Sequence, residues 1–366
     1  MAQYIDFKPN EYFSAITYTG DGGATRAITG VGFQPDFLWC KVNAGRNHYL
    51  CNSVIGPTYN LDSDSSAIEV NDTTGITSFD ADGFSIGSDT NGELNDSGTV
   101  QASWSWKMGT TSGLTGGTIT PAGYSINTTA CQGVYSYTGT GSAGTIAHGL
   151  GKVPSLMWVK SRSNTEDWPV YNGTVGYNSG ATTAAGYLDA TLNDSNARTT
   201  SSTMWNNVDA TDTTFTVGSN NQTNATGFTY IAYVFCDVPG YCLNGQYRGN
   251  GNADGPLIYT GFEPAFVICK NRDSGGPSNY GWTMYSNTFG MDGAPSTAPG
   301  YNTILDSFYA DQATGIATVE KIDFLANGFK LRGSGASSNQ SSSSFLFTAF
   351  AAQPIVGKNK NPQVAR

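Results

Sequence analysis

The chain has 366 residues, of which 13% are charged and 12% are aromatic, and it contains 46 glycines. Its 28 acidic residues outnumber the 18 Lys and Arg residues and leave a net charge of −10, which argues against a nucleic-acid partner because phosphates are neutralised by clustered basic side chains. The aromatic residues suffice to fill a core, and together with Thr and Gly they favour β-strands joined by many turns over disorder.

The beginning of the chain, "MAQYIDFKPNEYF", has neither the basic nor the apolar region of a signal peptide. No stretch approaches the roughly 20 apolar residues that span a bilayer, so we expect no membrane insertion. The six cysteines form no C-x-x-C pair of the kind found in zinc sites. Cys40 and Cys269 lie in apolar runs, and we expect buried free thiols in a protein made in a reducing compartment.

One segment occurs three times: "YTGDGGATRAITGVGFQPDFLWCK" from Tyr18, "YTGTGSAGTIAHGLGKVPSLMWVK" from Tyr137 and "YRGNGNADGPLIYTGFEPAFVICK" from Tyr247. The copies align at a proline and at a final lysine with a period of roughly 110–120 residues, which is the size of a small β domain rather than of a solenoid repeat. Each apolar run after the proline predicts a strand that is buried on both faces or lies in a sandwich core.

Three further elements follow in the same order in every copy. The first is "HYLCNSVIG", "WPVYNGTVG" or "WTMYSNTFG"; the second is "DGFSIGS", "TTFTVGS" or "NGFKLRGS"; the last is "VQASWSWK", "TYIAYVFC" or "SFLFTAFA". The alternation of the second element predicts a strand with one wet face. In the last element, residues two apart share a face, which pairs Trp104 with Trp106, Tyr233 with Phe235, and Phe345 with Phe347.

The predicted fold class is all-β, with three tandem β-sandwich domains of a jelly-roll-like type that arise from the internal repeat. The predicted boundaries are residues 1–109 for the first repeat, 110–240 for a connector hairpin plus the second repeat, 241–355 for the third repeat, and 356–366 for a basic C-terminal tail. We expect little helix, because no segment sustains a helical apolar period.

Two motifs look catalytic but fail in context. Residues 139–144 fit the dinucleotide fingerprint G-x-G-x-x-G, yet a phosphate-binding loop must open a helix, and the glycines and proline that follow prevent one. Residues 83–87, "GFSIG", fit the nucleophile motif G-x-S-x-G, yet Ser85 lies in an alternating strand rather than in a strand–turn–helix. We interpret these residues as a turn and a strand.

Metal and acid–base sites are also poorly supported. The chain has two histidines, and His48 occupies the position of Trp168 and Trp282 in the other repeats, which indicates packing or partial exposure. The loop "LDSDSS" (61–66) lacks the ligand spacing of a calcium-binding loop. We therefore expect no catalytic residue, no metal and no cofactor, and predict that the protein is not an enzyme.

The repeated lysines, Lys41, Lys160 and Lys270, close the apolar runs. The favoured interpretation is a charged strand end that reaches water. The alternative is a shared contact point in an assembly.

As a set, segments such as "ITGVGFQPDFLWCK", "SFDADGFSIGS", "WNNVDATDTTFTVGS" and "YIAYVFCDVPGY" resemble a family of marine phage proteins, and the resemblance extends from about Phe7 to Pro354. That family is usually described only as a domain of unknown function in virion structural or tail-fibre-like proteins. The resemblance implies a virion component and carries over no catalytic or metal-binding residue.

The predicted function is accordingly that of a non-enzymatic structural protein on the exterior of a phage virion: a fibre, appendage or capsid-decoration subunit. Its expected partners are other virion proteins and further copies of itself, with a trimer possible. The short tail carries Lys358, Lys360 and Arg366 without acidic residues, and we hypothesise that it docks on an acidic virion surface.

Two alternatives remain open. The first is a lectin-like receptor-binding module for host polysaccharide, in which Trp168, Trp205 with Asn206, and Trp282 would contact the glycan or another partner. The second is a polysaccharide-cleaving enzyme of the tailspike type.

Overall fold

The structure, a computed structural model, describes residues 5–173, 190–197, 199, 201–276, 280–288, 303–318 and 321–354. Within these residues the chain forms antiparallel β-sheets, with one short 3-10 helix, η1 (Pro9–Glu11), and one helical turn, α1 (Asn221–Asn224). No helix in these ranges is long and apolar enough to cross a membrane. The predicted all-β class is confirmed.

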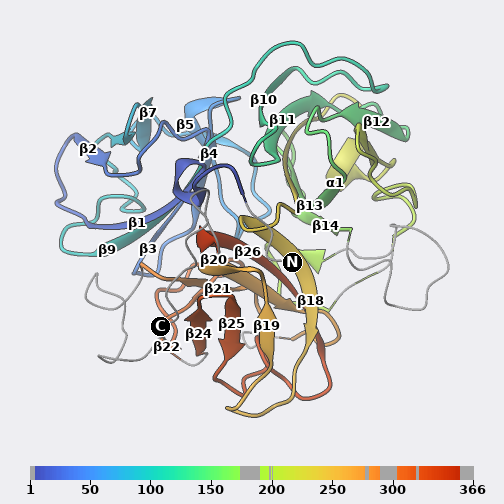
Figure 1. The fold of residues 1–366 in the computed structure, drawn as a ribbon. Helices are drawn as coiled ribbons and strands as arrows, with labels where there is room; N and C mark the ends of the chain where they lie inside the picture. The colour runs from blue at the N-terminus through green and yellow to red at the C-terminus, as the bar shows by residue number, and fades with distance from the viewer. Residues whose placement is uncertain are drawn as a thin grey trace.

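Each repeat supplies its own strands, and the three sets form three lobes around a common centre (Figure 1). The first repeat contains β1 (Phe13–Thr19), β2 (Arg26–Thr29), β3 (Phe37–Val42), β4 (Tyr49–Asn52), β5 (Gly56–Leu61), β6 (Val70–Asn71), β7 (Ile76–Asp80), β8 (Gly83–Ile86) and β9 (Val100–Trp106). The second contains β10 (Gly123–Asn127), β11 (Gln132–Thr138), β12 (Gly144–Ala147), β13 (Pro154–Ser161), β14 (Pro169–Asn172), β15 (Ala190–Thr191), β16 (Thr214–Val217) and β17 (Thr229–Cys236). The third contains β18 (Cys242–Arg248), β19 (Leu257–Tyr259), β20 (Phe262–Asn271), β21 (Thr283–Ser286), β22 (Thr303–Ile304), β23 (Phe308–Tyr309), β24 (Ile322–Leu325), β25 (Gly328–Leu331) and β26 (Ser344–Pro354).

The same strand order recurs in each repeat. The large sheets run β1-β9-β3-β4-β5-β6, β10-β11-β17-β13-β14-β15 and β18-β26-β20-β21-β23. The small sheets run β2-β8-β7, β12-β16 and β19-β25-β24-β22. In each large sheet the closing aromatic strand (β9, β17 or β26) therefore lies between β1, β11 or β18 and the strand at the proline, β3, β13 or β20.

The central strands of the large sheets are buried on both faces, as their apolar runs predict. In β3, Leu38 and Cys40 pack against the small sheet of their own repeat, where they meet Ile28 and Phe84. Trp39, which points the opposite way, joins the core that the three repeats share. A run without polar interruption is thus required because neither face of the strand meets water.

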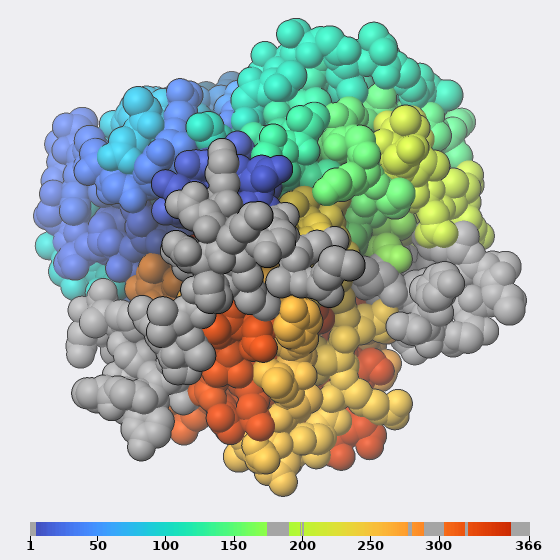
Figure 2. Space-filling view, in the orientation of Figure 1, coloured from blue at the N-terminus to red at the C-terminus, as the bar shows by residue number. Residues whose placement is uncertain are grey.

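Equivalent aromatic side chains from the three repeats meet at the centre of the molecule. Trp106, Phe235 and Phe350 occupy the same register position in β9, β17 and β26. Each pairs with the residue two positions after the proline of its repeat, which is Phe37, Leu156 or Phe266. Their ring centroids lie 6.2 Å apart for Trp106 and Phe235, and 5.4 Å apart for each of the two pairs with Phe350. In the space-filling view the three lobes likewise lie against one another (Figure 2). One hydrophobic cluster therefore contains residues of all three repeats.

The aromatic pair predicted in the third repeat is confirmed, but it lies on a different face from its counterpart in the first repeat. Phe345 and Phe347 do share a face, but that face packs against the small sheet of the same repeat. The residue that matches Trp106 is Phe350, which lies on the opposite face of β26. The pairing by two-residue period was right, whereas the period alone does not tell which of the two faces points to the centre.

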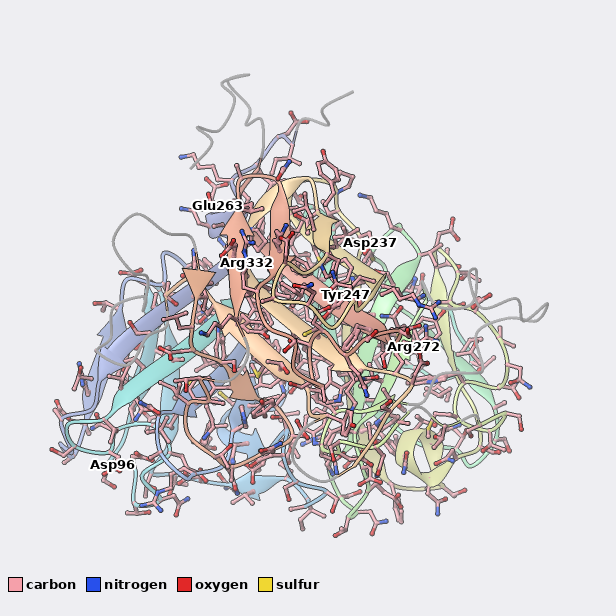
Figure 3. The ribbon with its side chains drawn as sticks, turned by 90° about the horizontal axis from the view of Figure 1, so that it is seen from below. Asp96, Asp237, Tyr247, Glu263, Arg272 and Arg332 are labelled. Carbon is pink, nitrogen blue, oxygen red and sulfur yellow. A yellow bond between two sulfur atoms is a disulfide. The ribbon has the colours of Figure 1, made fainter. Side chains whose placement is uncertain are left out.

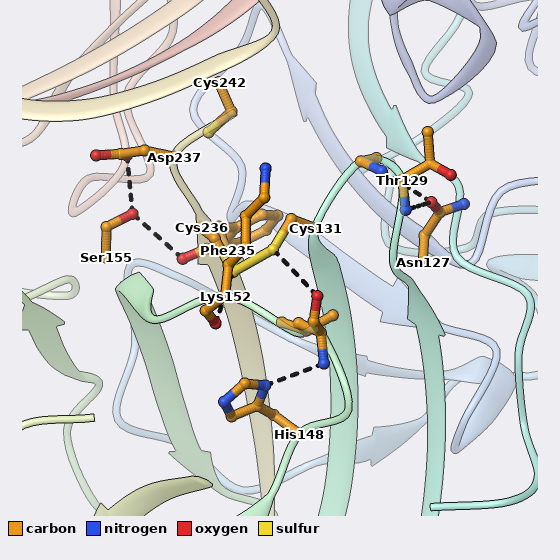
Figure 4. Close-up of a disulfide and its surroundings, with 12 residues drawn as sticks. Asn127, Thr129, Cys131, His148, Lys152, Ser155, Phe235, Cys236, Asp237 and Cys242 are labelled. Atoms are coloured by element: carbon orange, nitrogen blue, oxygen red, sulfur yellow. Dashed lines mark hydrogen bonds between the residues drawn. A yellow bond between two sulfur atoms is a disulfide. The ribbon is translucent and has the colours of Figure 1, made fainter. Parts of the chain in front are cut away.

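The connector before the second repeat covers two edges of that repeat. Its strand β10 pairs with β11, and Thr118 and Ile119 donate backbone hydrogen bonds to Thr145 O in β12. At the end of the β10–β11 hairpin, Cys131 forms a disulfide with Cys236 of β17 (Figure 4). The expectation of free thiols is wrong for this pair, while the buried residues Cys40, Cys51, Cys242 and Cys269 form no disulfide.

Candidate functional site

The interfaces between repeats share one contact, made by the residue at the position of His48. The indole N–H of Trp168 donates to Asp62 O (2.9 Å) in the first repeat, and the indole N–H of Trp282 donates to Thr191 O (2.7 Å) in the second. His48 Nε2 lies 3.0 Å from Tyr309 O in the third repeat. Each repeat thus bonds to the preceding one, and the first bonds to the third, so that the three contacts close a ring.

His48 makes this contact as a neutral side chain. Its Nδ1 accepts a hydrogen bond from Trp39 Nε1 (2.9 Å), which leaves the proton on Nε2 to be donated to Tyr309 O. Burial, reinforced by the charge of Lys41, holds the pKa of His48 well below its usual range. Of the two roles that the sequence left open for this histidine, packing and partial exposure, the structure shows packing, because the side chain is fully buried.

In each loop that supplies an accepting carbonyl, the side chain two residues further along also accepts a hydrogen bond. The donor is the backbone N–H of the residue at the His48 position in the same repeat. Asp64 Oδ1 accepts from the amide of His48 (3.1 Å), Asn193 Oδ1 from that of Trp168 (2.9 Å), and Asp311 Oδ1 from that of Trp282 (2.7 Å). Because the same offset recurs three times, the loops that contain these residues are equivalent parts of the repeat. Burial raises the pKa of Asp64 and that of Asp311.

The repeated lysines lie inside the molecule. Lys41, Lys160 and Lys270 are buried, and in each case burial lowers the pKa to about 8. Lys41 Nζ donates to Ala313 O of the third repeat (3.2 Å), and Lys160 Nζ donates to Ser66 O of the first (3.2 Å). The favoured interpretation as strand ends in water is wrong, because carbonyl oxygens of the next loop and of the neighbouring repeat replace water around the ammonium groups.

The third interface differs from the other two. Lys270 Nζ donates to Tyr280 O within its own repeat (2.6 Å). Between the second and third repeats lies an open polar cleft of about 370 Å³, lined by Asn193, Asp194, Ser195, Asn196, Asp311 and Gln312. The negative charges of Asp311 and Asp194 partly offset the lowering of the pKa of Lys270 by burial. Amide, hydroxyl and carboxylate groups line this hollow, which suits a small polar ligand such as a sugar hydroxyl face.

The predicted glycan-contact residues are not assembled at a common surface. Trp168, Trp205 and Trp282 expose at most 2% of their surface, so their ring faces cannot stack on a sugar, and this part of the prediction conflicts with the structure. Trp205 instead packs edge-on against Tyr171, with ring centroids 5.6 Å apart. Asn206 is exposed in a turn with a φ of 55°. The predicted docking residues Lys358, Lys360 and Arg366 lie outside the described residues.

The catalytic-looking motifs hold structural positions. Ser85 Oγ donates to Asp80 Oδ2 (2.6 Å) within the β7–β8 hairpin. Gly139 and Gly141 lie in the turn before β12, where Gly141 has a φ of 74°. Among the described residues, no group of three or more His, Cys, Asp and Glu side chains is placed to hold a metal ion.

The sequence analysis missed the cleft because it considered only the first of the three equivalent loops, residues 61–66, and only as a calcium-binding loop. A signal was present. The residues that cap the backbone, Asp64, Asn193 and Asp311, follow at an equivalent place in each repeat, and all three can accept a hydrogen bond. Aligning the loops as well as the strands would have marked them as a structural element.

The comparisons with known proteins agree with the extent of the fold. A search of the curated proteins found no match. The model of the family described as "Domain of unknown function (DUF7483)" matches residues 8–354, which include all three repeats. The chain therefore belongs to the DUF7483 family.

Proposed function

We propose that the chain is a non-enzymatic structural protein on the exterior of a phage virion, where it acts as a rigid fibre, appendage or capsid-decoration subunit. The proposal takes each repeat to be a jelly-roll-like sandwich of its large and small sheets. The observation that carries it is the closed ring of contacts, in which buried histidine, tryptophan and lysine groups hold three repeats on one aromatic core. Such a core suits a subunit that must keep its shape under load.

The ring also bears on the expected oligomer. Three equivalent units already surround a common centre within one chain, so a threefold arrangement does not require three chains. Assembly of the proposed subunit then needs contacts on the outer sides of the lobes, and several weak contacts of this kind would combine through avidity.

The test is the location of the protein in purified particles of the phage whose genome encodes it. We expect stoichiometric amounts by quantitative mass spectrometry, and labelling of the particle exterior by an antibody against the chain. Its absence from gradient-purified particles, together with its presence in infected-cell lysate, would overturn the proposal.

The polar cleft between the second and third repeats favours glycan binding as a second candidate function. Its lining supplies hydrogen-bond donors and acceptors from both repeats, although the predicted tryptophans take no part. A glycan array probed with the wild type and with the double variant Asn196→Ala/Gln312→Ala tests it, with Asn91→Ala as the control on an exposed turn of the first repeat. Binding that is equal in all three proteins would remove the cleft as the site. A polysaccharide-cleaving activity stays a prediction, to be tested by release of reducing ends from host capsule.

A further inference from the structure

The equivalent strands β2, β12 and β19 each lie at the edge of the small sheet of their repeat, and the three edges differ. Ile28, Ile146 and Ile258 mark equivalent positions, because each pairs with the phenylalanine of the alternating strand, in β8, β16 and β25 respectively. The residues on either side of this isoleucine point away from the core. These flanking residues and the segments beside them differ between the three edges.

The second repeat covers its edge with another segment of the chain. Thr118 N and Ile119 N both donate to Thr145 O, at 2.8 and 2.9 Å, and Thr145 N donates to Thr118 Oγ1 (2.8 Å). Ile119 is buried by this contact. The fold therefore accommodates an additional extended segment beside β12.

The first repeat leaves its edge exposed but gives it small side chains. Ala27 and Thr29 flank Ile28 in β2, and both are exposed. Small side chains of this kind would bury little apolar surface if another strand paired with this edge.

The third repeat combines an open edge with large apolar side chains. Leu257 and Tyr259 flank Ile258 in β19, and their exposed fractions are 57% and 64%. β19 pairs with β25 and with no other strand among the described residues. Leu331 N donates to Pro256 O and Thr260 N donates to Asn327 O, so the backbone groups of the even-numbered residues face β25. By alternation, those of Leu257 and Tyr259 face away from it.

We propose that β19 pairs antiparallel with β19 of a second copy of the chain and joins the two small sheets into one. In a two-fold pair centred on Ile258, Leu257 lies opposite Tyr259 of the second copy. Each such pair exchanges two backbone hydrogen bonds and brings a leucine against a tyrosine ring, and the two-fold axis makes the contact occur twice. The edge is complementary to itself, which selects a second copy over an unrelated partner.

The charges around the edge permit this contact in spite of the acidic chain. Lys330, which lies opposite Leu257 in β25, pairs with Asp254 (2.6 Å), and Arg332, labelled in Figure 3, pairs with Asp323 (2.5 Å). The four charges balance, so the net charge of −10 is not concentrated where the copies would meet. The inference relies on the proposed function only for the expectation of self-association.

Sedimentation equilibrium of the full chain, from micromolar to millimolar concentration, tests the inference. We expect the wild type to dimerise. The double variant Leu257→Ala/Tyr259→Thr carries the residue types that the first repeat has at these positions, and we expect its association to be at least tenfold weaker. Val153→Ala, at a site that is 52% exposed and outside any strand, is the matched control and should dimerise as the wild type does.

A wild type that stays monomeric over this range would overturn the proposal, and so would a double variant that dimerises as tightly as the wild type. The result is independent of the particle-location experiment. A protein found on virions but monomeric in solution would refute the β19 contact alone, and a dimer absent from particles would refute the proposed function alone.

Discussion

His48 Nε2 and the backbone oxygen of Tyr309 lie 3.0 Å apart and join the first repeat to the third, at the position where the other two interfaces use an indole N–H. The variant His48→Phe replaces the imidazole with a phenyl ring. It removes this hydrogen bond and the one that Trp39 Nε1 donates to His48. We expect a loss of about 2–4 kcal/mol in the free energy of unfolding at pH 7.5, because a buried donor and a buried acceptor lose their partners. Urea denaturation followed by tryptophan fluorescence measures it.

The same variant has a pH signature. The native pKa of His48 is depressed by burial, so below about pH 6.5 the unfolded chain takes up a proton that the folded chain refuses. The wild type therefore loses stability on acidification through this group at about 1.4 kcal/mol per pH unit, whereas His48→Phe does not. The difference in the free energy of unfolding between the wild type and His48→Phe should therefore become smaller from pH 7.5 to pH 5. A difference that widens would contradict the neutral, buried imidazole.

The indole hydrogen bonds of the other two interfaces can be tested against a tryptophan that has none. Trp168→Phe and Trp282→Phe each remove a donor to a carbonyl of the preceding repeat. Trp205 is equally buried, but its Nε1 has no hydrogen-bond partner among the described residues, so Trp205→Phe supplies the matched control. We expect the first two variants to lose about 1–2 kcal/mol more than the control, as judged by urea midpoints. Equal losses in all three would mean that only ring volume matters at the interfaces.

The sequence allowed the strands and the threefold repeat to be predicted because alternation and apolar runs report burial directly. It did not allow the ring to be predicted. The run around Trp39 shows that both faces of β3 are covered, but any apolar surface could cover the second face, including that of another chain. The identity of the covering surface depends on how the repeats close on one another, which no single repeat encodes.

The lysines show a second limit. A lysine after an apolar run resembles a strand end in water, yet β3, β13 and β20 each continue past it by one residue. Burial of the ammonium group depends on carbonyls that come from distant parts of the chain, such as Ala313 for Lys41. The disulfide escaped prediction for a related reason, because its cysteines are 105 residues apart and only the sheet register brings them together.

The carboxyl group of Glu93 makes the stability of the fold depend on pH in the opposite direction to His48. Burial, followed by the charges of Asp62 and three further aspartates, raises the pKa of Glu93 to about 8. The unfolded chain releases this proton from about pH 4.5 and the folded chain only near pH 8, so the group destabilises the fold progressively as pH rises between these values. Glu93→Gln should therefore be more stable than the wild type at pH 8, by about 1 kcal/mol after allowance for partial exposure. The gain should vanish below pH 4.5, and a destabilised variant at pH 8 would refute the assignment.

The disulfide predicts a thiol count and a stability change. Denatured under non-reducing conditions, the protein should expose four thiols to alkylation and keep Cys131 and Cys236 protected. The double variant Cys131→Ala/Cys236→Ala should lose about 2–4 kcal/mol, since the bond closes a long loop in the unfolded chain. Cys242→Ala removes a buried free thiol close to the bond (Figure 4) and should cost less. Six reactive thiols in freshly purified oxidised protein would contradict the bond.

The shared core predicts that the repeats do not fold alone. A fragment of residues 1–240 lacks Phe350, which contacts both Trp106 and Phe235, and lacks Phe266, which packs within 5.3 Å of Trp104. It also lacks Tyr309, the acceptor for His48. We expect this fragment to show red-shifted tryptophan emission, to bind a hydrophobic dye and to lose the cooperative urea transition of the full chain, because several large rings lose their cover at once. The complementary fragment 241–354, which would expose Phe266 and Phe350, should behave in the same way. If either fragment unfolds cooperatively with a native-like near-ultraviolet circular dichroism spectrum, the repeats are independent domains and the central aromatic contact is not required for folding.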